Sequence, residues 1–155
     1  MLSSDFIHAR LSHDFAEALR ALMSRRIFPK GATVYRQGDP AEGIYLVETG
    51  AVRVLLPLSD NQNQLLEVAG PGTILGLSES LSADRYRVTA EAEETTNTSF
   101  ATSKEFVDLI DIRHDFCMQV VRLLSENLHG LYHRFRSVSA HPGRPRRRML
   151  DEELN

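Results

Sequence analysis

Two groups of residues in this sequence have types and spacings that could support metal binding or nucleophilic catalysis. His129 and His133 are four residues apart, a spacing that places both on one face of a helix and can hold a metal ion. No third ligand accompanies them, so we interpret them as exposed helix residues and predict no metal site. Ser78, Glu79 and Ser80 have no histidine nearby in the sequence that would activate a hydroxyl. The G-x-S-x-G, P-loop and G-x-G-x-x-G motifs are also absent from the sequence, and we therefore predict no catalytic residues and no enzyme activity.

The composition predicts one domain of ordinary size. The chain has 155 residues, of which 42% are hydrophobic and 25% charged, so it can bury a core. A net charge of −3 gives no general attraction to nucleic acid or to an anionic membrane. Cys117 is the single cysteine, which excludes an internal disulfide framework. No apolar run approaches the ~20 residues of a membrane helix and the start has no apolar signal core, so a cytoplasmic location is expected.

Hydrophobic spacing predicts helices on both sides of a strand-rich centre. Residues 12–26 have the spacing of an amphipathic helix, with Ser12 as its N-cap. Residues 32–100 alternate between apolar and polar positions and are interrupted by glycine turns, which is typical of a small sandwich or barrel. Thr102 and Glu105 fit a capping box at the start of a short helix. A long helix is expected over 115–138.

The stretch Gly31–Val54 combines short strand-like runs with glycine turns at fixed offsets. It reads GATVYRQGDPAEGIYLVETGAVRV. This pattern resembles the first half of the cyclic-nucleotide-binding domain of bacterial regulators of the catabolite activator protein and fumarate-nitrate regulator (CRP/FNR) type. The resemblance covers about residues 12–138 and implies an α+β, mainly β fold. In that fold a double-stranded β-helix, or jelly-roll barrel, carries an N-terminal helix and a long C-terminal dimerisation helix. It also implies a small-ligand sensor that acts in signal transduction and transcription regulation.

A second part of the resemblance lies at Gly70–Leu77 and Tyr86–Ala92. In the family these segments flank a phosphate-binding cassette. There, backbone N–H groups at a helix N-terminus and an arginine bind the cyclic phosphate, and a glutamate accepts a hydrogen bond from the ribose. The resemblance therefore implies cyclic AMP or cyclic GMP as the candidate ligand, and no other cofactor is predicted. The candidate ligand-binding residues are Gly76, Leu77, Ser78, Glu79, Arg85, Tyr86, Arg87 and Thr89.

The sequence departs from the family pattern at two cassette positions. Leu77 stands at the glutamate position and Tyr86 at the arginine position, with Arg85 and Arg87 on either side of it. Because strand side chains alternate between faces, Arg85 reaches inward only through a loop or a bulge. Three functions stay open: a cyclic-nucleotide sensor, a sensor of another small anion that uses Arg85 or Arg87, and a degenerate domain, closed by Leu77 and Tyr86, that acts as a protein-interaction module.

The expected long helix carries an apolar seam with heptad spacing. Its start is Cys117, and the predicted dimer-seam residues are Val121, Leu124, Leu128, Leu131 and Phe135. Val120, Leu123 and Leu124 are expected to face the barrel, whereas the later seam residues lie beyond its edge. In the resembled family this helix forms the dimer, and we favour a parallel homodimer over simple core packing.

Residues 139–155 differ from the rest in composition, with two prolines and the run Arg146-Arg147-Arg148. We predict a mobile basic and acidic tail there and a sensor domain over 1–138. A helix-turn-helix reader needs about three helices, so we expect no direct sequence-specific DNA binding by this chain. Both a stand-alone sensor and a piece of a longer regulator fit the sequence.

Overall fold

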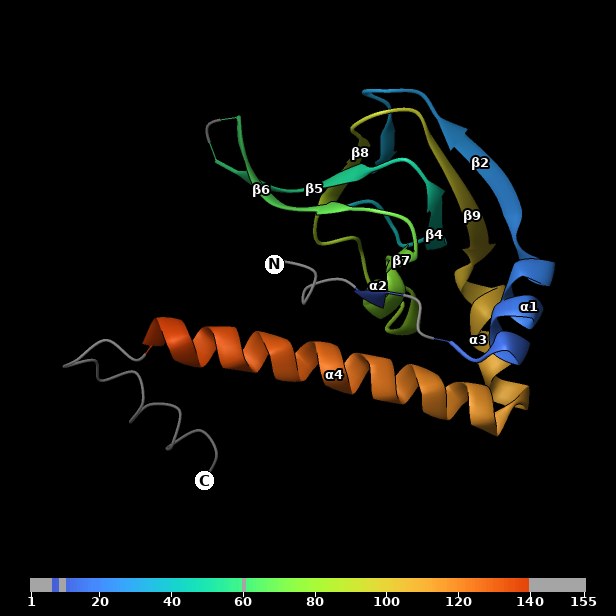
Figure 1. Ribbon diagram of the computed structural model, residues 1–155. Coiled ribbons are helices and arrows are strands. Elements are labelled where there is room, and N and C mark those ends of the chain that lie inside the picture. Colours follow the sequence, from blue (N-terminus) through green and yellow to red (C-terminus); the bar gives the residue numbers. More distant parts are fainter. Residues whose placement is uncertain (1–6, 9–10, 60, 140–155) are drawn as a thin grey trace.

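The computed structural model describes the backbone of residues 7–8, 11–59 and 61–139 and the side chains of 11–59 and 61–126. The expected tail therefore lies outside the described residues, apart from Ser139. Two antiparallel sheets face each other, and helices cover the outer side of one of them (Figure 1). This arrangement confirms the expected α+β, mainly β, jelly-roll architecture.

Nine strands of the described residues form the two sheets. The first sheet has the order β1 (Ile7–His8), β7 (Thr73–Leu75), β4 (Gly43–Thr49), β9 (Thr96–Thr102), β2 (Ser24–Phe28). The second has the order β3 (Thr33–Tyr35), β8 (Thr89–Ala92), β5 (Val52–Leu58), β6 (Gln62–Ala69). The helices are α1 (His13–Leu22), α2 (Leu77–Leu81), α3 (Ser103–Ile112) and α4 (His114–Ser139).

Side-chain alternation along β4 creates two separate cores. Ile44 and Leu46 point outward and pack under α1, α3 and α4. Tyr45 and Val47 point between the sheets, into a core rich in tyrosine. The candidate site residue Tyr86 also lies in this inner core.

The prediction of one helix over 12–26 is wrong beyond residue 22. Residues 24–28 form strand β2 instead, because each of them pairs with a residue of β9, from Ser24 opposite Phe100 to Phe28 opposite Thr96. This pairing joins segments about seventy residues apart. The local spacing of apolar residues carries no information about such a distant partner. The predicted caps are confirmed: the Ser12 hydroxyl accepts from the α1 backbone, and Thr102 and Glu105 form the capping box of α3.

Helix α4 confirms the long helix expected over 115–138. Its first turns bury Phe116, Val120 and Leu123 against the outer core, and its far end extends beyond the other helices (Figure 1). Among the described residues, no helix is both long enough and apolar enough to cross a membrane.

Candidate functional site

Gly76 begins α2 at the candidate cassette and brings three backbone segments together. Its φ of 83° lies in the left-handed region that favours glycine. A Cβ atom at this position would lie 3.0 Å from both the Gly43 carbonyl oxygen and the Tyr86 ring. The absence of a side chain therefore allows the start of α2 to close directly over β4 and Tyr86.

The four side chains that follow Gly76 point in different directions. Leu77 is buried in the outer core and Ser78 is exposed. The half-buried Glu79 accepts a hydrogen bond at Oε2 from the backbone N–H of Arg87, at 3.3 Å. The Oγ of Ser80 is buried and makes no hydrogen bond among the described residues. The cassette helix therefore offers an apolar side chain where the resembled family has its glutamate.

Tyr86 fills the inner core directly beside Gly76. Only 3% of the residue is exposed, and its ring stacks on Tyr35 with centroids 3.8 Å apart. Its hydroxyl donates to the carbonyl of Gly43 at 2.8 Å and accepts from the N–H of Gly43 at 3.2 Å. Burial raises the pKa of Tyr86 to about 12, so the phenol stays neutral at physiological pH. The side chain is thus held in place at both its ring and its hydroxyl.

The two arginines that flank Tyr86 point away from the interior. Arg85 is exposed, and its Nη1 donates to the carbonyl of Gly38 at 2.7 Å. Arg87 is exposed, and its Nη2 pairs with Asp84 at 3.0 Å. The pKa of Asp84 is lowered first by a hydrogen bond from the backbone N–H of Arg85 and then by the Arg87 side chain. This segment precedes β8 and is joined to the fold by a single bridge between Arg85 and Pro40, and it leaves both guanidinium groups on the surface.

Two carboxylates, Glu79 and Glu42, lie near the stacked rings of Tyr35 and Tyr86. Burial, and after it the charge of Glu79, raises the pKa of Tyr35 well above its usual value. Glu42 adds in the same way to the raised pKa of Tyr86, after the larger effect of burial. Negative charge near the two stacked rings disfavours a phosphate there.

Arg26 of β2 is a cation on the inner side of the roll, but it is already held by aromatic side chains. Its guanidinium lies 3.6 Å from the ring centroid of Phe100, and its Nη1 donates to the hydroxyl of Tyr45 at 3.0 Å. This cation–π packing assigns Arg26 a structural role in the inner core.

The predicted site residues therefore separate into two groups. Gly76, Leu77 and Tyr86 are buried at the start of α2, with Tyr86 in the inner core and Leu77 in the outer core. The two arginines lie outside, and Thr89 Oγ1 accepts a hydrogen bond from the backbone N–H of Gln37 at 3.0 Å. This arrangement is a closed aromatic core with an ionic outer surface.

Sequence reasoning missed Gly43 and Tyr35 as parts of this site. Gly43 carries both hydrogen bonds to Tyr86, and Tyr35 provides the stacking surface. A glycine at the first position of a strand pattern signals a close backbone approach, and this signal was available at Gly43. The stacking of Tyr35 has no such local signal.

The residues of the predicted dimer seam are only partly described. Val121 has 48% of its surface exposed, whereas Leu124 packs partly against the outer core. The side chains of Leu128, Leu131 and Phe135 lie outside the described residues, as do those of His129 and His133. The prediction that Val120, Leu123 and Leu124 face the body of the domain is confirmed. Among the described residues, no three His, Cys, Asp or Glu side chains are close enough to hold a metal ion.

Comparison with protein families gives a match to the cyclic nucleotide-binding domain over residues 25–113. The chain is 27% identical over 130 residues to the cyclic AMP receptor protein of Thermus thermophilus, covering 81% of this chain and 60% of that protein. It is 28% identical over 113 residues to the transcriptional activator protein FnrA of Stutzerimonas stutzeri, covering 72% of this chain and 46% of FnrA.

A solved structure extends the similarity to three dimensions. The crystal structure of the Thermus thermophilus catabolite activator protein matches with a TM-score of 0.62 and 26% identity, over 94% of this chain and 59% of that one. The chain thus spans between 46% and 60% of the length of the two curated relatives. Those relatives are a receptor protein and a transcriptional activator, in agreement with the expectation that this chain is not an enzyme.

Proposed function

This chain belongs to the cyclic nucleotide-binding domain family, and we propose that it is the regulatory domain of a CRP/FNR-type transcriptional regulator whose nucleotide pocket is closed by its own Tyr86. Residues 1–138 form this domain, which acts in the cytoplasm. Its signal passes through a homodimer of α4, and DNA contact belongs to another segment or another protein.

The position of Tyr86 is the observation that carries the proposal. In the family an arginine at this position binds the cyclic phosphate, whereas here a neutral ring occupies the interior, stacked on Tyr35 and bonded to Gly43. A nucleotide would have to displace the ring, break both hydrogen bonds at Gly43 and approach carboxylates without an arginine partner from the cassette. The same geometry disfavours a small-anion sensor that uses Arg85 or Arg87, since both guanidinium groups are bound on the outer surface.

Isothermal titration with cyclic AMP and cyclic GMP tests this proposal. The protein is first dialysed extensively to remove any nucleotide carried through purification. We expect no binding heat and no thermal shift at up to about 1 mM nucleotide, a concentration far above micromolar affinities. Saturable micromolar binding of either nucleotide would overturn the closed pocket and restore the nucleotide-sensor function.

The surface of α4 supports the homodimer. Phe116, Val120 and Leu123 face the body, and an apolar residue follows each of them: Cys117, Val121 and Leu124, of which Leu124 also packs partly against the outer core. Successive residues of a helix differ by about 100°, so this second stripe is turned roughly a quarter of a circle from the first. Val121, at 48% exposed, is not covered by its own domain. A partner helix would bury this stripe and its heptad continuation.

Light scattering during size-exclusion chromatography tests the dimer. The wild-type chain should elute at about twice its 17.5 kDa mass at roughly 100 µM protein. Val121→Glu should shift the population toward the monomer because it places a charge in the seam. Val107→Glu is the matched control, since Val107 is also an exposed valine but lies on α3. A monomeric wild type, or equal effects of the two variants, would rule out this seam.

A further inference from the structure

The outer face of the first sheet continues beyond the helices that cover it. Along β4, Ile44 and Leu46 lie under the helices, and the next side chain on that face is Glu48. On the neighbouring strand β9, Ser99 and Asn97 lie on the same face. The outer face of the sheet therefore changes from apolar to polar side chains at the point where α1 ends.

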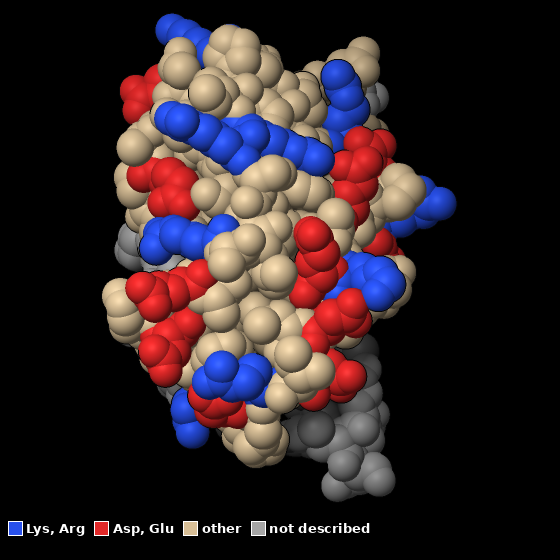
Figure 2. Space-filling view, turned by 90° about the vertical axis from the view of Figure 1, so that its right-hand side faces the viewer, with Lys and Arg blue, Asp and Glu red and all other residues tan. Residues whose placement is uncertain are grey.

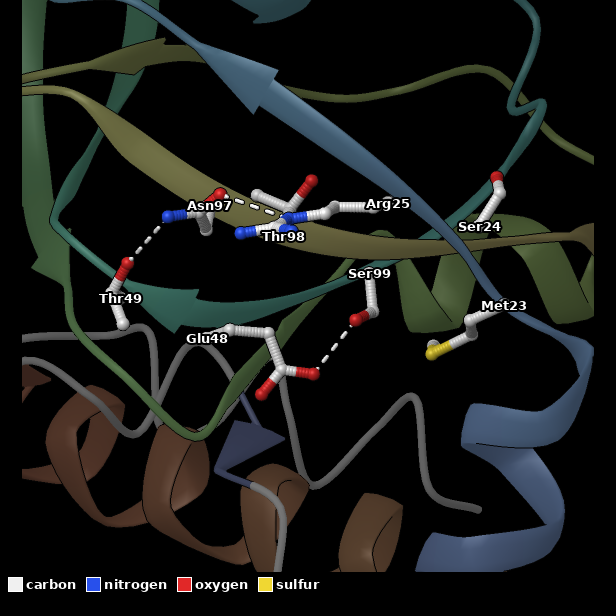
Figure 3. A pocket seen from close by; sticks show the side chains of 8 residues that line it. All are labelled: Met23, Ser24, Arg25, Glu48, Thr49, Asn97, Thr98 and Ser99. Carbon is white, nitrogen blue, oxygen red and sulfur yellow. Dashed lines mark hydrogen bonds between the residues drawn. The ribbon is translucent and has the colours of Figure 1, made fainter.

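A pocket of about 370 Å³ occupies this polar end, near the lower limit of small-molecule sites. Figure 3 shows its side chains, which come from β2, β4, β9 and the C-cap of α1, Met23. The lining residues are Met23, Ser24, Arg25, Glu48, Thr49, Asn97, Thr98 and Ser99. This pocket lies on the outer side of the sheet and is separate from the inner core that Tyr86 fills.

Glu48 forms the acidic side of the pocket. Its carboxylate accepts hydrogen bonds from Arg20 Nε at 3.1 Å, Arg20 Nη2 at 3.2 Å and Ser99 Oγ at 2.7 Å. Partial burial alone would raise the pKa of Glu48, but these hydrogen bonds lower it, so the group is ionised at neutral pH. A carboxylate has about four acceptor positions, and Oε1 receives only one of the three bonds. Oε1 can accept a further hydrogen bond from a ligand.

Arg25 forms the basic side. Its Nε donates to Asn97 Oδ1 at 3.3 Å, and Asn97 Nδ2 donates to Thr49 Oγ1 at 3.0 Å (Figure 3). Asn97 is therefore held from both sides and orients the guanidinium. Within the described part of the chain, Arg25 makes no other hydrogen bond or ion pair, so its terminal N–H groups remain available for an anion.

We propose that this pocket binds a compact amino acid or hydroxy acid. Its carboxylate would pair with the terminal N–H groups of Arg25, and its ammonium or hydroxyl group would donate to Glu48 Oε1. A phosphate dianion fits less well, because its second charge would face Glu48. Basic and acidic residues are interspersed on this side of the molecule, with no broad area of one sign that would attract a polyanion (Figure 2).

The pocket is also connected to α4. Arg20, which holds Glu48, belongs to α1, and α1 stacks its Phe15 on Phe116 of α4 with ring centroids 4.4 Å apart. Ser12, the N-cap of α1, and Gln119 of α4 add two hydrogen bonds between them. A ligand that bonds to Glu48 therefore acts on the contact through which α1 supports α4. An effect of this ligand on the α4 homodimer rests on the proposed function, whereas binding of the ligand in the outer pocket does not.

Titration of the ¹⁵N-labelled full chain with L-serine and with glycolate, followed by amide chemical shifts, tests the proposal. Acetate lacks the donor and ethanolamine lacks the carboxylate, so they serve as control compounds. Arg25→Gln removes the anion partner, and Glu48→Gln keeps the shape of the side chain but removes its charge. Arg53→Gln is the matched control, because Arg53 is a half-exposed arginine on the other sheet.

We expect saturable shifts that are largest at residues 23–25, 48–49 and 97–99, with at least one of the two acids, at millimolar or lower Kd. Arg25→Gln should weaken binding by about tenfold or more and Glu48→Gln by about threefold, with Arg53→Gln unchanged. Equal shifts with acetate and ethanolamine, an effect of Arg53→Gln as large as that of Arg25→Gln, or no shifts with either acid at roughly 20 mM would overturn the proposal. None of these results depends on whether a nucleotide binds or a dimer forms.

Discussion

Replacing Tyr86 by phenylalanine isolates the two hydrogen bonds that hold the ring in the inner core. The substitution keeps the stack on Tyr35 but leaves the buried N–H and C=O of Gly43 without the phenol. A buried polar group that loses its partner costs about 1–3 kcal/mol, so the free energy of unfolding should fall by about that amount. Tyr86→Ala also removes the ring and should cost about 3–5 kcal/mol or more, because a cavity remains beside Gly76.

Urea unfolding at a fixed protein concentration measures both losses, with an unchanged m-value as evidence that the unfolding reaction is the same. Tyr35→Phe is the matched control. Its ring belongs to the same stack, but within the described residues its hydroxyl makes no hydrogen bond, so the cost should be below about 0.5 kcal/mol. If Tyr86→Phe were as stable as the wild type, or if Tyr35→Phe cost more, the hydroxyl would not hold the ring and the reasoning would fail.

Three further substitutions or conditions test the local arguments. Gly76→Ala should cost about 1–3 kcal/mol more than Gly38→Ala in urea unfolding, because both glycines have a positive φ but only at Gly76 would a Cβ meet neighbouring atoms; equal losses would contradict the close approach. Thr102→Ala removes the capping-box hydroxyl of α3 and should lower stability by about 1 kcal/mol, seen as a lower Tm; an unchanged Tm would show that the cap contributes nothing. The raised pKa of Tyr86 gives stability that is fully present below pH 10 and is lost as the pH rises toward about 12, so wild-type Tm should fall more steeply over this range than that of Tyr86→Phe; parallel curves would contradict the burial of the phenol.

Local sequence signals predicted much of the fold. The caps at Ser12 and Thr102, the extent of α4 and the mainly β centre depend on residues within a few positions of one another, and all were predictable. The family resemblance stated from the Gly31–Val54 pattern is confirmed by the family match over residues 25–113. Strand β2 was not predictable, since only its distant partner β9 makes residues 24–28 a strand.

The departure of the candidate site from the family pattern was predictable, but the direction of its side chains was not. Residues 85–88 precede β8 and form no strand beyond the single bridge between Arg85 and Pro40, so alternation does not decide which side chain faces inward. Tyr86 faces inward because Gly43, 43 residues away in sequence, offers it a donor and an acceptor. The outer polar pocket was not predictable for the same reason, because its residues come from the end of α1 and from three strands that meet only in the folded chain.

The amide resonance of Gly43 gives the most direct test of the closed pocket, because this N–H donates to the Tyr86 hydroxyl at 3.2 Å. In a ¹H–¹⁵N spectrum of the wild-type chain, we predict that this resonance shifts on Tyr86→Phe substitution but stays in place when about 1 mM cyclic AMP is added. A nucleotide-dependent shift of Gly43 that saturates would show that the ligand displaces Tyr86, and would contradict the claim that this side chain closes the pocket.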